Sequence, residues 1–114
     1  MHVLDTPDGR YIVVHGRLWR RHRPDLEPVE RDRLRRDLME ARRSIRIGRR
    51  SGDRALLAAA SAVVEAAKRS LGERGPVWWS DGTPDFDRRM IWNTSYAPWY
   101  ETLPGNERTM HGRR

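Results

Sequence analysis

The sequence predicts an α+β protein: an N-terminal β-hairpin and an antiparallel two-helix hairpin, with a Trp-rich C-terminal segment and a short third helix packed on it. Apolar residues alternate on both sides of a two-residue His15-Gly16 step, which is typical of strands. In the central part of the chain they recur every three to four residues, which is typical of amphipathic helices. Four of the five tryptophans follow Gly75, and they define the C-terminal segment.

The β-hairpin is expected over residues 10–20. A two-residue loop needs positive φ angles at its centre, which Gly16 accepts freely and His15 tolerates better than most residues. The cross-strand pairs that result are Val14 with Arg17, Val13 with Leu18, Ile12 with Trp19 and Tyr11 with Arg20. Both faces of the hairpin then carry apolar side chains, so we expect both to be at least partly covered.

The helical hairpin is expected over residues 29–71, with the first helix running to about Arg50. Its apolar stripe comprises Leu34, Leu38, Ala41 and Ile45. Gly52 is suited to a left-handed position after this helix, and Asp53 is suited to cap a second helix that runs to Leu71. Its apolar stripe comprises Leu56, Leu57, Ala60, Val63, Val64, Ala67 and Leu71. Because the connection is short, the two helices should be antiparallel neighbours.

The C-terminal part is expected to form a Trp-rich cap over residues 75–100. The Thr-Pro-Asp triplet at Thr83 has the cap-then-proline pattern of a helix start, which predicts a short helix from about Pro84 to Trp92. Residues 101–114 are polar and contain Pro and Gly, so we expect a disordered tail. Residues 1–100 are then a single small domain.

Composition favours anionic partners. Lys+Arg number 23 against 16 Asp+Glu, for a net charge of +7, and Lys68 is the single lysine. Such a charge attracts phosphate backbones, anionic membranes or acidic proteins. The same arginine-rich composition also arises in a GC-rich genome without selection for binding, and both interpretations remain open. The absence of cysteine excludes disulfides, thiolate catalysis and Cys-ligated metal centres.

No targeting or membrane segment is expected. The N-terminus has neither a basic region nor an apolar run typical of a signal peptide. The longest apolar run, within Ala55–Ala67, is interrupted by Ser61 and Glu65 and is too short to span a bilayer. We therefore expect a cytoplasmic protein without a membrane partner.

The first helix predicts a broad basic face. With an advance of 100° per residue, most of its arginines gather on one side of the apolar stripe. The candidate nucleic-acid-binding residues are Arg35, Arg42, Arg43, Arg46 and Arg49. One interpretation is a helix that lies along phosphate oxygens. The other is a solvated face with partial i,i+4 ion pairing.

A second candidate site is the neighbourhood of Trp78 and Trp79. Consecutive side chains on an extended segment point to opposite faces, so the two indoles cannot both enter one core. Either could stack on a flat ligand, and the alternative is packing by a C-terminal segment that wraps over the hairpin. Asp81 and Asp85 nearby would complete a small-ligand or enzyme site, although turn and helix-cap roles also explain them. The spacing of the acidic residues does not fit a calcium loop. We expect no catalytic set, metal or cofactor.

The leading functional hypothesis is therefore a small, basic, non-enzymatic protein that binds DNA or RNA through the arginine-rich helix. The alternative is a protein-interaction module or homodimeric adaptor, because a helical hairpin with a thin core gains stability by pairing into a four-helix bundle. Ile47 lies outside the apolar stripe and is a candidate partner contact.

The chain also resembles a family of short, uncharacterised proteobacterial proteins over about residues 8–100. The motifs that carry the resemblance are GRLWR at residues 16–20, LMEARR at residues 38–43 and GERGPVWWSDGTPD at residues 72–85. Members occasionally have a Tol-like transport label, which we attribute to their Ala/Arg-rich helices. The resemblance implies a bacterial origin and supplies no catalytic residues.

Overall fold

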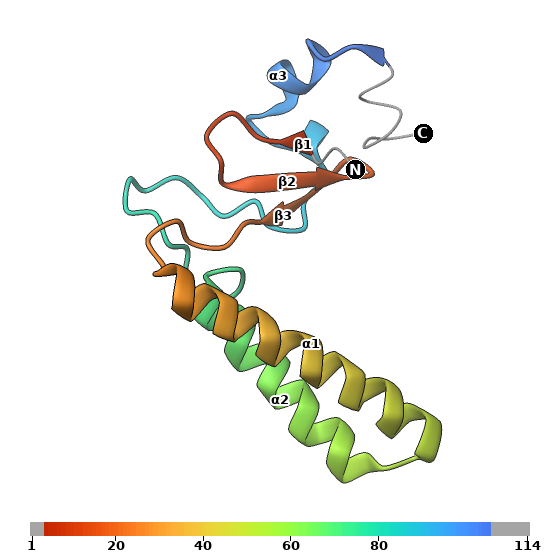
Figure 1. Ribbon diagram of the computed structural model, residues 1–114. Helices are drawn as coiled ribbons and strands as arrows, with labels where there is room; N and C mark the ends of the chain where they lie inside the picture. Colours follow the sequence, from red (N-terminus) through yellow and green to blue (C-terminus); the bar gives the residue numbers. More distant parts are fainter. Residues whose placement is uncertain (1–3, 106–114) are drawn as a thin grey trace. The chain divides into compact units, whose positions relative to one another are not determined.

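A computed structural model describes residues 4–105 of the chain. They divide into two compact units: residues 4–21 and 79–105 form the sheet unit, and His22–Trp78 form the helical unit. The element order is three strands, two long helices, a 3-10 helix and a short α-helix (Figure 1). The α+β class, with its hairpin of strands, hairpin of helices and short third helix, is confirmed.

The sheet is antiparallel with the order β1-β2-β3. Strands β2 (Tyr11–Val14) and β3 (Arg17–Arg20) pair in the predicted register. The loop between them has the expected positive φ angles, 52° at His15 and 79° at Gly16. A strand that the sequence analysis did not predict, β1 (Leu4–Asp5), pairs with β2.

One face of the sheet carries the core of this unit, which comprises Leu4, Tyr11, Val13, Leu18, Ile91 and Tyr100. Half-buried groups from the C-terminal segment pack against it, namely Trp79, Phe86, Trp92, Tyr96, Trp99 and Leu103. The opposite face is less covered than expected: Ile12 is half-buried, and Val14 and Trp19 are each 39% exposed.

The helix predicted from Pro84 to Trp92 is not formed, and this prediction was wrong. The backbone N–H of Arg88 donates to the Leu18 carbonyl, and the N–H of Leu18 donates to the Arg89 carbonyl, at 2.7 and 2.9 Å. The segment therefore extends along β3, and this pairing takes the backbone groups that a helix would need. A 3-10 helix, η1 (Ile91–Asn93), follows, and the third helix, α3 (Ala97–Glu101), lies later in the chain than predicted.

The prediction of a disordered tail from residue 101 starts the tail too early. Glu101 is the last residue of α3, and Leu103 packs against the core of the sheet unit. The rest of that prediction, over residues 106–114, lies outside the described residues.

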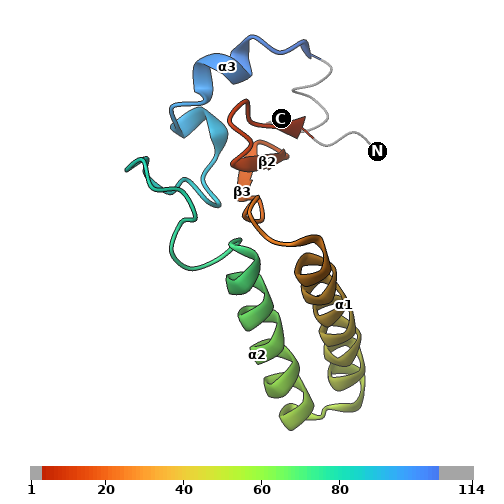
Figure 2. The same ribbon diagram turned by 60° about the vertical axis from the view of Figure 1, so that its left-hand side comes forward.

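The helical hairpin has nearly the predicted bounds. Helix α1 (Pro28–Ser51) ends at Gly52, whose φ of 73° is left-handed. Helix α2 (Arg54–Leu71) begins after Asp53, whose side chain accepts a 3.0 Å hydrogen bond from the Leu56 N–H. The two helices run antiparallel, side by side, in both views (Figures 1 and 2).

The core of the hairpin is thin. It comprises Leu34, Leu38, Ala67 and Leu71, with Leu26 and Val64 packed against it. Gly48 lets the helices approach closely, because a Cβ at this position would lie 3.0 Å from Leu57 Cγ. Val63 belongs to the predicted stripe but is 44% exposed. No helix within residues 4–105 has the length and apolar character needed to cross a lipid bilayer.

Candidate nucleic-acid interface

The arginines of α1 that flank its buried stripe form one row along the helix. Arg42, Arg46 and Arg49 are separated by four and three residues, so they lie one above another on the same side. Arg35 is seven residues before Arg42 and continues the row. At 1.5 Å per residue, the row from Arg35 to Arg49 extends for about 21 Å.

Three of these arginines line a groove between the two helices. The groove has a volume of about 400 Å³ and is lined by Arg42, Ile45, Arg46, Arg49, Val64, Lys68 and Arg74. We call this the basic groove. Its apolar lining comes from Ile45 and Val64, and its other lining side chains are all cationic. Lys68 is contributed by α2, and Arg74 by the segment that follows α2.

Two of the five cations have carboxylate partners. Lys68 Nζ lies 3.0 Å from Glu73 Oε1, and Arg74 Nη1 lies 2.6 Å from Glu65 Oε1. Hydrogen bonds from Arg74 and from Arg69 hold the pKa of Glu65 below its usual value. Glu65 therefore stays ionised near neutral pH and positions Arg74 beside the groove.

The remaining three cations of the groove are exposed and have no such partner. Among residues 4–105, Arg42, Arg46 and Arg49 form no ion pair or side-chain hydrogen bond. Arg33, on another side of the same helix, is by contrast paired with Glu30 and with Asp37. Glu30 and Asp37 are thus paired away from the arginine row, and the side chains that line the groove carry a net positive charge.

The other two predicted binding residues lie outside the groove lining. Arg35 is exposed and belongs to the same row, about two turns before Arg42. Arg43 is also exposed, but it is 100° around the helix from Arg42 and does not line the groove. The candidates therefore separate into a row of four beside or near the groove and one residue on the outer side of α1.

Chemically, the basic groove can bind anionic oxygens. Guanidinium groups present planar pairs of N–H donors that match phosphate and carboxylate oxygens. The groove lining contains no carboxylate, hydroxyl or imidazole that could act as a nucleophile or proton acceptor.

The two candidate stacking residues lie in different surroundings. Trp78 is half-buried and lies beside Gly72, the residue that follows α2. A Cβ on Gly72 would be 3.1 Å from Trp78 Cδ1. Trp79 packs on the core of the sheet unit, edge-on to Tyr11 with 5.8 Å between ring centroids. The guanidinium of Arg10 lies 4.7 Å from the Trp79 ring centroid. These contacts favour packing over a ligand platform at Trp79.

The two candidate carboxylates, Asp81 and Asp85, each form an ion pair with an arginine. Asp81 pairs with Arg10, whose hydrogen bond keeps the pKa of Asp81 well below its usual value. Asp85 lies 3.4 Å from Arg20 Nη2 and accepts a 3.0 Å hydrogen bond from the Asp87 N–H. Within residues 4–105, no group of three or more His, Asp or Glu side chains is arranged to hold a metal ion. The contacts of Asp81 and Asp85 favour structural roles.

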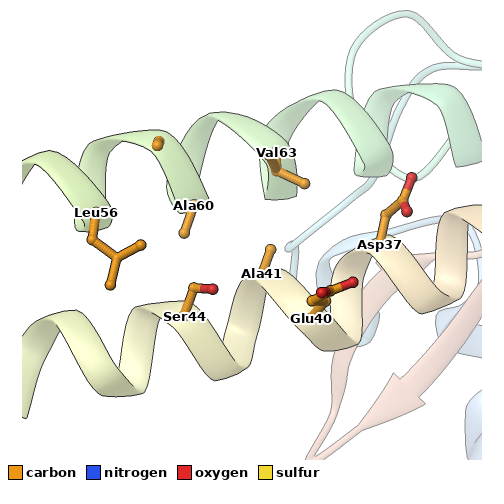
Figure 3. Close-up of a pocket in the computed structure, with 8 residues that line it drawn as sticks. Asp37, Glu40, Ala41, Ser44, Leu56, Ala60 and Val63 are labelled. Atoms are coloured by element: carbon orange, nitrogen blue, oxygen red, sulfur yellow. The ribbon is translucent and has the colours of Figure 1, made fainter.

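A second groove, which is mainly apolar, lies between the same two helices. It has a volume of about 290 Å³ and is lined by Asp37, Glu40, Ala41, Ser44, Leu56, Ala59, Ala60 and Val63. Figure 3 shows Leu56 and Ala60 of α2 opposite Ser44 of α1. Ile47 on α1 is 50% exposed. These are the features that an interaction module or homodimer would use, and that hypothesis stays a prediction.

The sequence analysis did not place Lys68 or Arg74 at the site. The signal for Lys68 was present, because it follows Val64 by one helical turn and so flanks the apolar stripe of α2. Arg74 lies beyond the helix end, and only the observed 2.6 Å contact with Glu65 identifies its position.

Comparison with protein-family models, with curated proteins and with solved structures gives no significant match to this chain. The resemblance to the proteobacterial family therefore stays a prediction from its motifs.

Proposed function

We propose that this chain is a non-enzymatic binding protein whose basic groove and arginine row bind the phosphate backbone of a nucleic acid. The observation that carries the proposal is a set of three exposed arginines, unpaired within the described residues 4–105, beside Lys68 in one groove. Neutralising several phosphates with such cations releases condensed counterions, which is the main source of sequence-independent affinity.

The shape of the site supports this ligand over a small anion. The row from Arg35 to Arg49 is about 21 Å long, whereas a single phosphate would contact only one or two of its arginines. Each strand of duplex DNA carries one phosphate charge per roughly 3.4 Å of the helix axis, so a strand lying along α1 offers several phosphates over the length of the row. The expected binding is insensitive to base sequence, because contacts to the backbone position a protein without reading the bases.

The test is the salt dependence of duplex binding. Each phosphate contact contributes roughly 0.9 to the slope of log affinity against log salt, so four contacts predict a slope of about −4. Replacing Arg42 and Arg46 together with Gln should bring the slope to about −2. Gln has a similar helix propensity, and exposed positions have small effects on stability. Fluorescence anisotropy with a labelled duplex over a salt series measures the slope.

The matched control replaces Arg36 and Arg43 with Gln. This pair lies on the outer side of the same helix and removes the same charge, so its slope should stay close to that of the wild type. Equal slopes for the two double variants would contradict a role for the groove. A wild-type slope near zero would contradict nucleic-acid binding altogether.

A further inference from the structure

The exposed face of the sheet carries a tryptophan with arginines around it. Trp19 is 39% exposed, and its cross-strand partner on β2 is Ile12. Because side chains alternate along a strand, Arg17 lies on the same face as Trp19, and Leu18 between them enters the core. The Arg17–Met90 bridge and the backbone bonds of Leu18 to Arg88 and Arg89 extend the surface beyond β3. Trp19 therefore lies within this surface and not at its free edge.

Arg88 has an unusual backbone conformation next to this ring. Its φ is 70°, a left-handed value that favours Gly or Asn and disfavours most other residues. Its N–H donates to the Leu18 carbonyl, and its own carbonyl accepts a 2.6 Å hydrogen bond from Arg17 Nη1. Its guanidinium carbon lies 5.9 Å from the centroid of the Trp19 ring. Arginine gains nothing from this backbone conformation, so its presence here indicates a role for its side chain.

The charge around Trp19 is positive. Arg17 and Arg88 are both exposed, and the guanidinium of Arg88 is the one beside the ring. The nearby carboxylate of Asp87 lies 4.0 Å from Arg88 Nε. Asp87 is only 15% exposed, and its other oxygen accepts a hydrogen bond from the Arg20 N–H. It therefore offsets one of these two charges at most.

We propose that Trp19 is a stacking platform for an unpaired base of a single-stranded nucleic acid, with Arg17 and Arg88 contacting the flanking phosphates. Single-strand-binding surfaces combine aromatic rings that stack on bases with cations that follow the backbone. An exposed indole between arginines has both. Duplex DNA keeps its bases stacked inside, so it cannot use the ring. The proposal stands on the sheet unit alone and goes beyond the basic groove.

The test measures the affinity of the whole chain for oligothymidylate of about 15 nucleotides, within the range that single-strand sites cover. Replacing Trp19 with Leu keeps an apolar side chain beside Ile12 but removes the ring. Loss of one base stack should weaken binding by about fivefold to one-hundredfold. Trp19→Phe should retain most of the affinity, and the control Val14→Ala, on the same face, should bind as the wild type does.

The salt slope of Trp19→Leu should equal that of the wild type, because stacking releases no counterions. The double variant Arg42→Gln, Arg46→Gln should show the converse. Its salt slope should differ from that of the wild type, and adding Trp19→Leu to it should weaken binding by the same factor as in the wild type. Failure of the platform and failure of the basic groove are therefore distinguishable.

Arg88→Gly provides a variant that should fold at least as well as the wild type, because glycine accepts the left-handed φ. We expect it to weaken oligothymidylate binding several-fold and to change the salt slope by about 0.7, the contribution of one single-strand phosphate contact. Wild-type affinity in both Trp19→Leu and Arg88→Gly would overturn the proposal. Equal losses of affinity for single-stranded and duplex probes in these variants would also overturn it. So would complete competition by thymidine monophosphate at the same nucleotide concentration, because this would indicate a site for a free nucleotide.

Discussion

Replacing Leu18 with Ala is expected to destabilise the sheet unit by about 2–5 kcal/mol, the usual range for this substitution in a closed core. Leu18 is fully buried and lies in the cluster with Val13 and Ile91. Its backbone also joins β3 to Arg88 and Arg89, so a shift at this position would disturb both neighbours. Since native domains have only about 5–15 kcal/mol of stability in total, this is a large fraction.

The loss is measured as the decrease in the denaturation midpoint, followed by near-ultraviolet circular dichroism of the aromatic cluster. Val14→Ala is the matched control, because Val14 is four residues away in the same hairpin but on the exposed face. We expect its effect to be within about 1 kcal/mol. If the two substitutions had equal effects, the assignment of the buried face would be wrong.

Replacing Gly72 with Ala is expected to destabilise the helical unit by roughly 2–5 kcal/mol. Gly72 has a φ of 85°, which costs an alanine about 1–2 kcal/mol. A Cβ would also lie 3.0 Å from Arg23 Cβ and 3.1 Å from Trp78 Cδ1. Overpacking of this kind adds roughly 1–3 kcal/mol.

Gly52→Ala separates the two contributions. Gly52 has a similar φ of 73°, but nothing lies within 4 Å of the position of its Cβ. The Gly52→Ala variant should therefore lose only the conformational part of the stability, about 1–2 kcal/mol. Urea denaturation of both variants gives the difference, and equal losses would show that the contacts around Gly72 do not constrain it.

The sequence predicts those parts of the fold whose signals are local. The register of β2 and β3 follows from a two-residue loop at His15-Gly16, because that loop leaves only one pairing. The ends of α1 and α2 follow from Gly52 and Asp53, whose backbone and side-chain preferences act on adjacent residues.

The predictions fail where contacts between residues far apart in the sequence determine the local structure. The triplet at Thr83 has a helix-start pattern, but pairing of Arg88 and Arg89 with Leu18 satisfies their backbone groups instead. β1 contains only Leu4–Asp5, which is too short for a period to be recognised.

The candidate site divides in the same way. The arginine row of α1 can be predicted because all its members lie on one helix and one advance angle relates them. The contributions of Lys68 and Arg74 require the alignment of α1 with α2, which no local pattern specifies. Likewise, the sequence favours Trp78 and Trp79 as stacking residues because they are adjacent, whereas exposure depends on tertiary packing. Trp19, which the sequence analysis placed only as a hairpin residue, is the indole with an open environment.

The most direct test of the basic groove uses Lys68, because it is the single lysine of the chain and lines the groove. Its rate of acetylation by an amine-reactive ester can be followed by peptide mass spectrometry, with the N-terminal amine as an internal reference. Binding of duplex DNA in the groove predicts that the Lys68 rate falls with DNA concentration, along the same curve as the anisotropy signal. The reference amine should change little, and Arg42→Gln with Arg46→Gln should shift the protection to higher DNA concentrations. If Lys68 reacts at an unchanged rate when DNA is fully bound, the nucleic acid lies elsewhere and the account of the groove is contradicted.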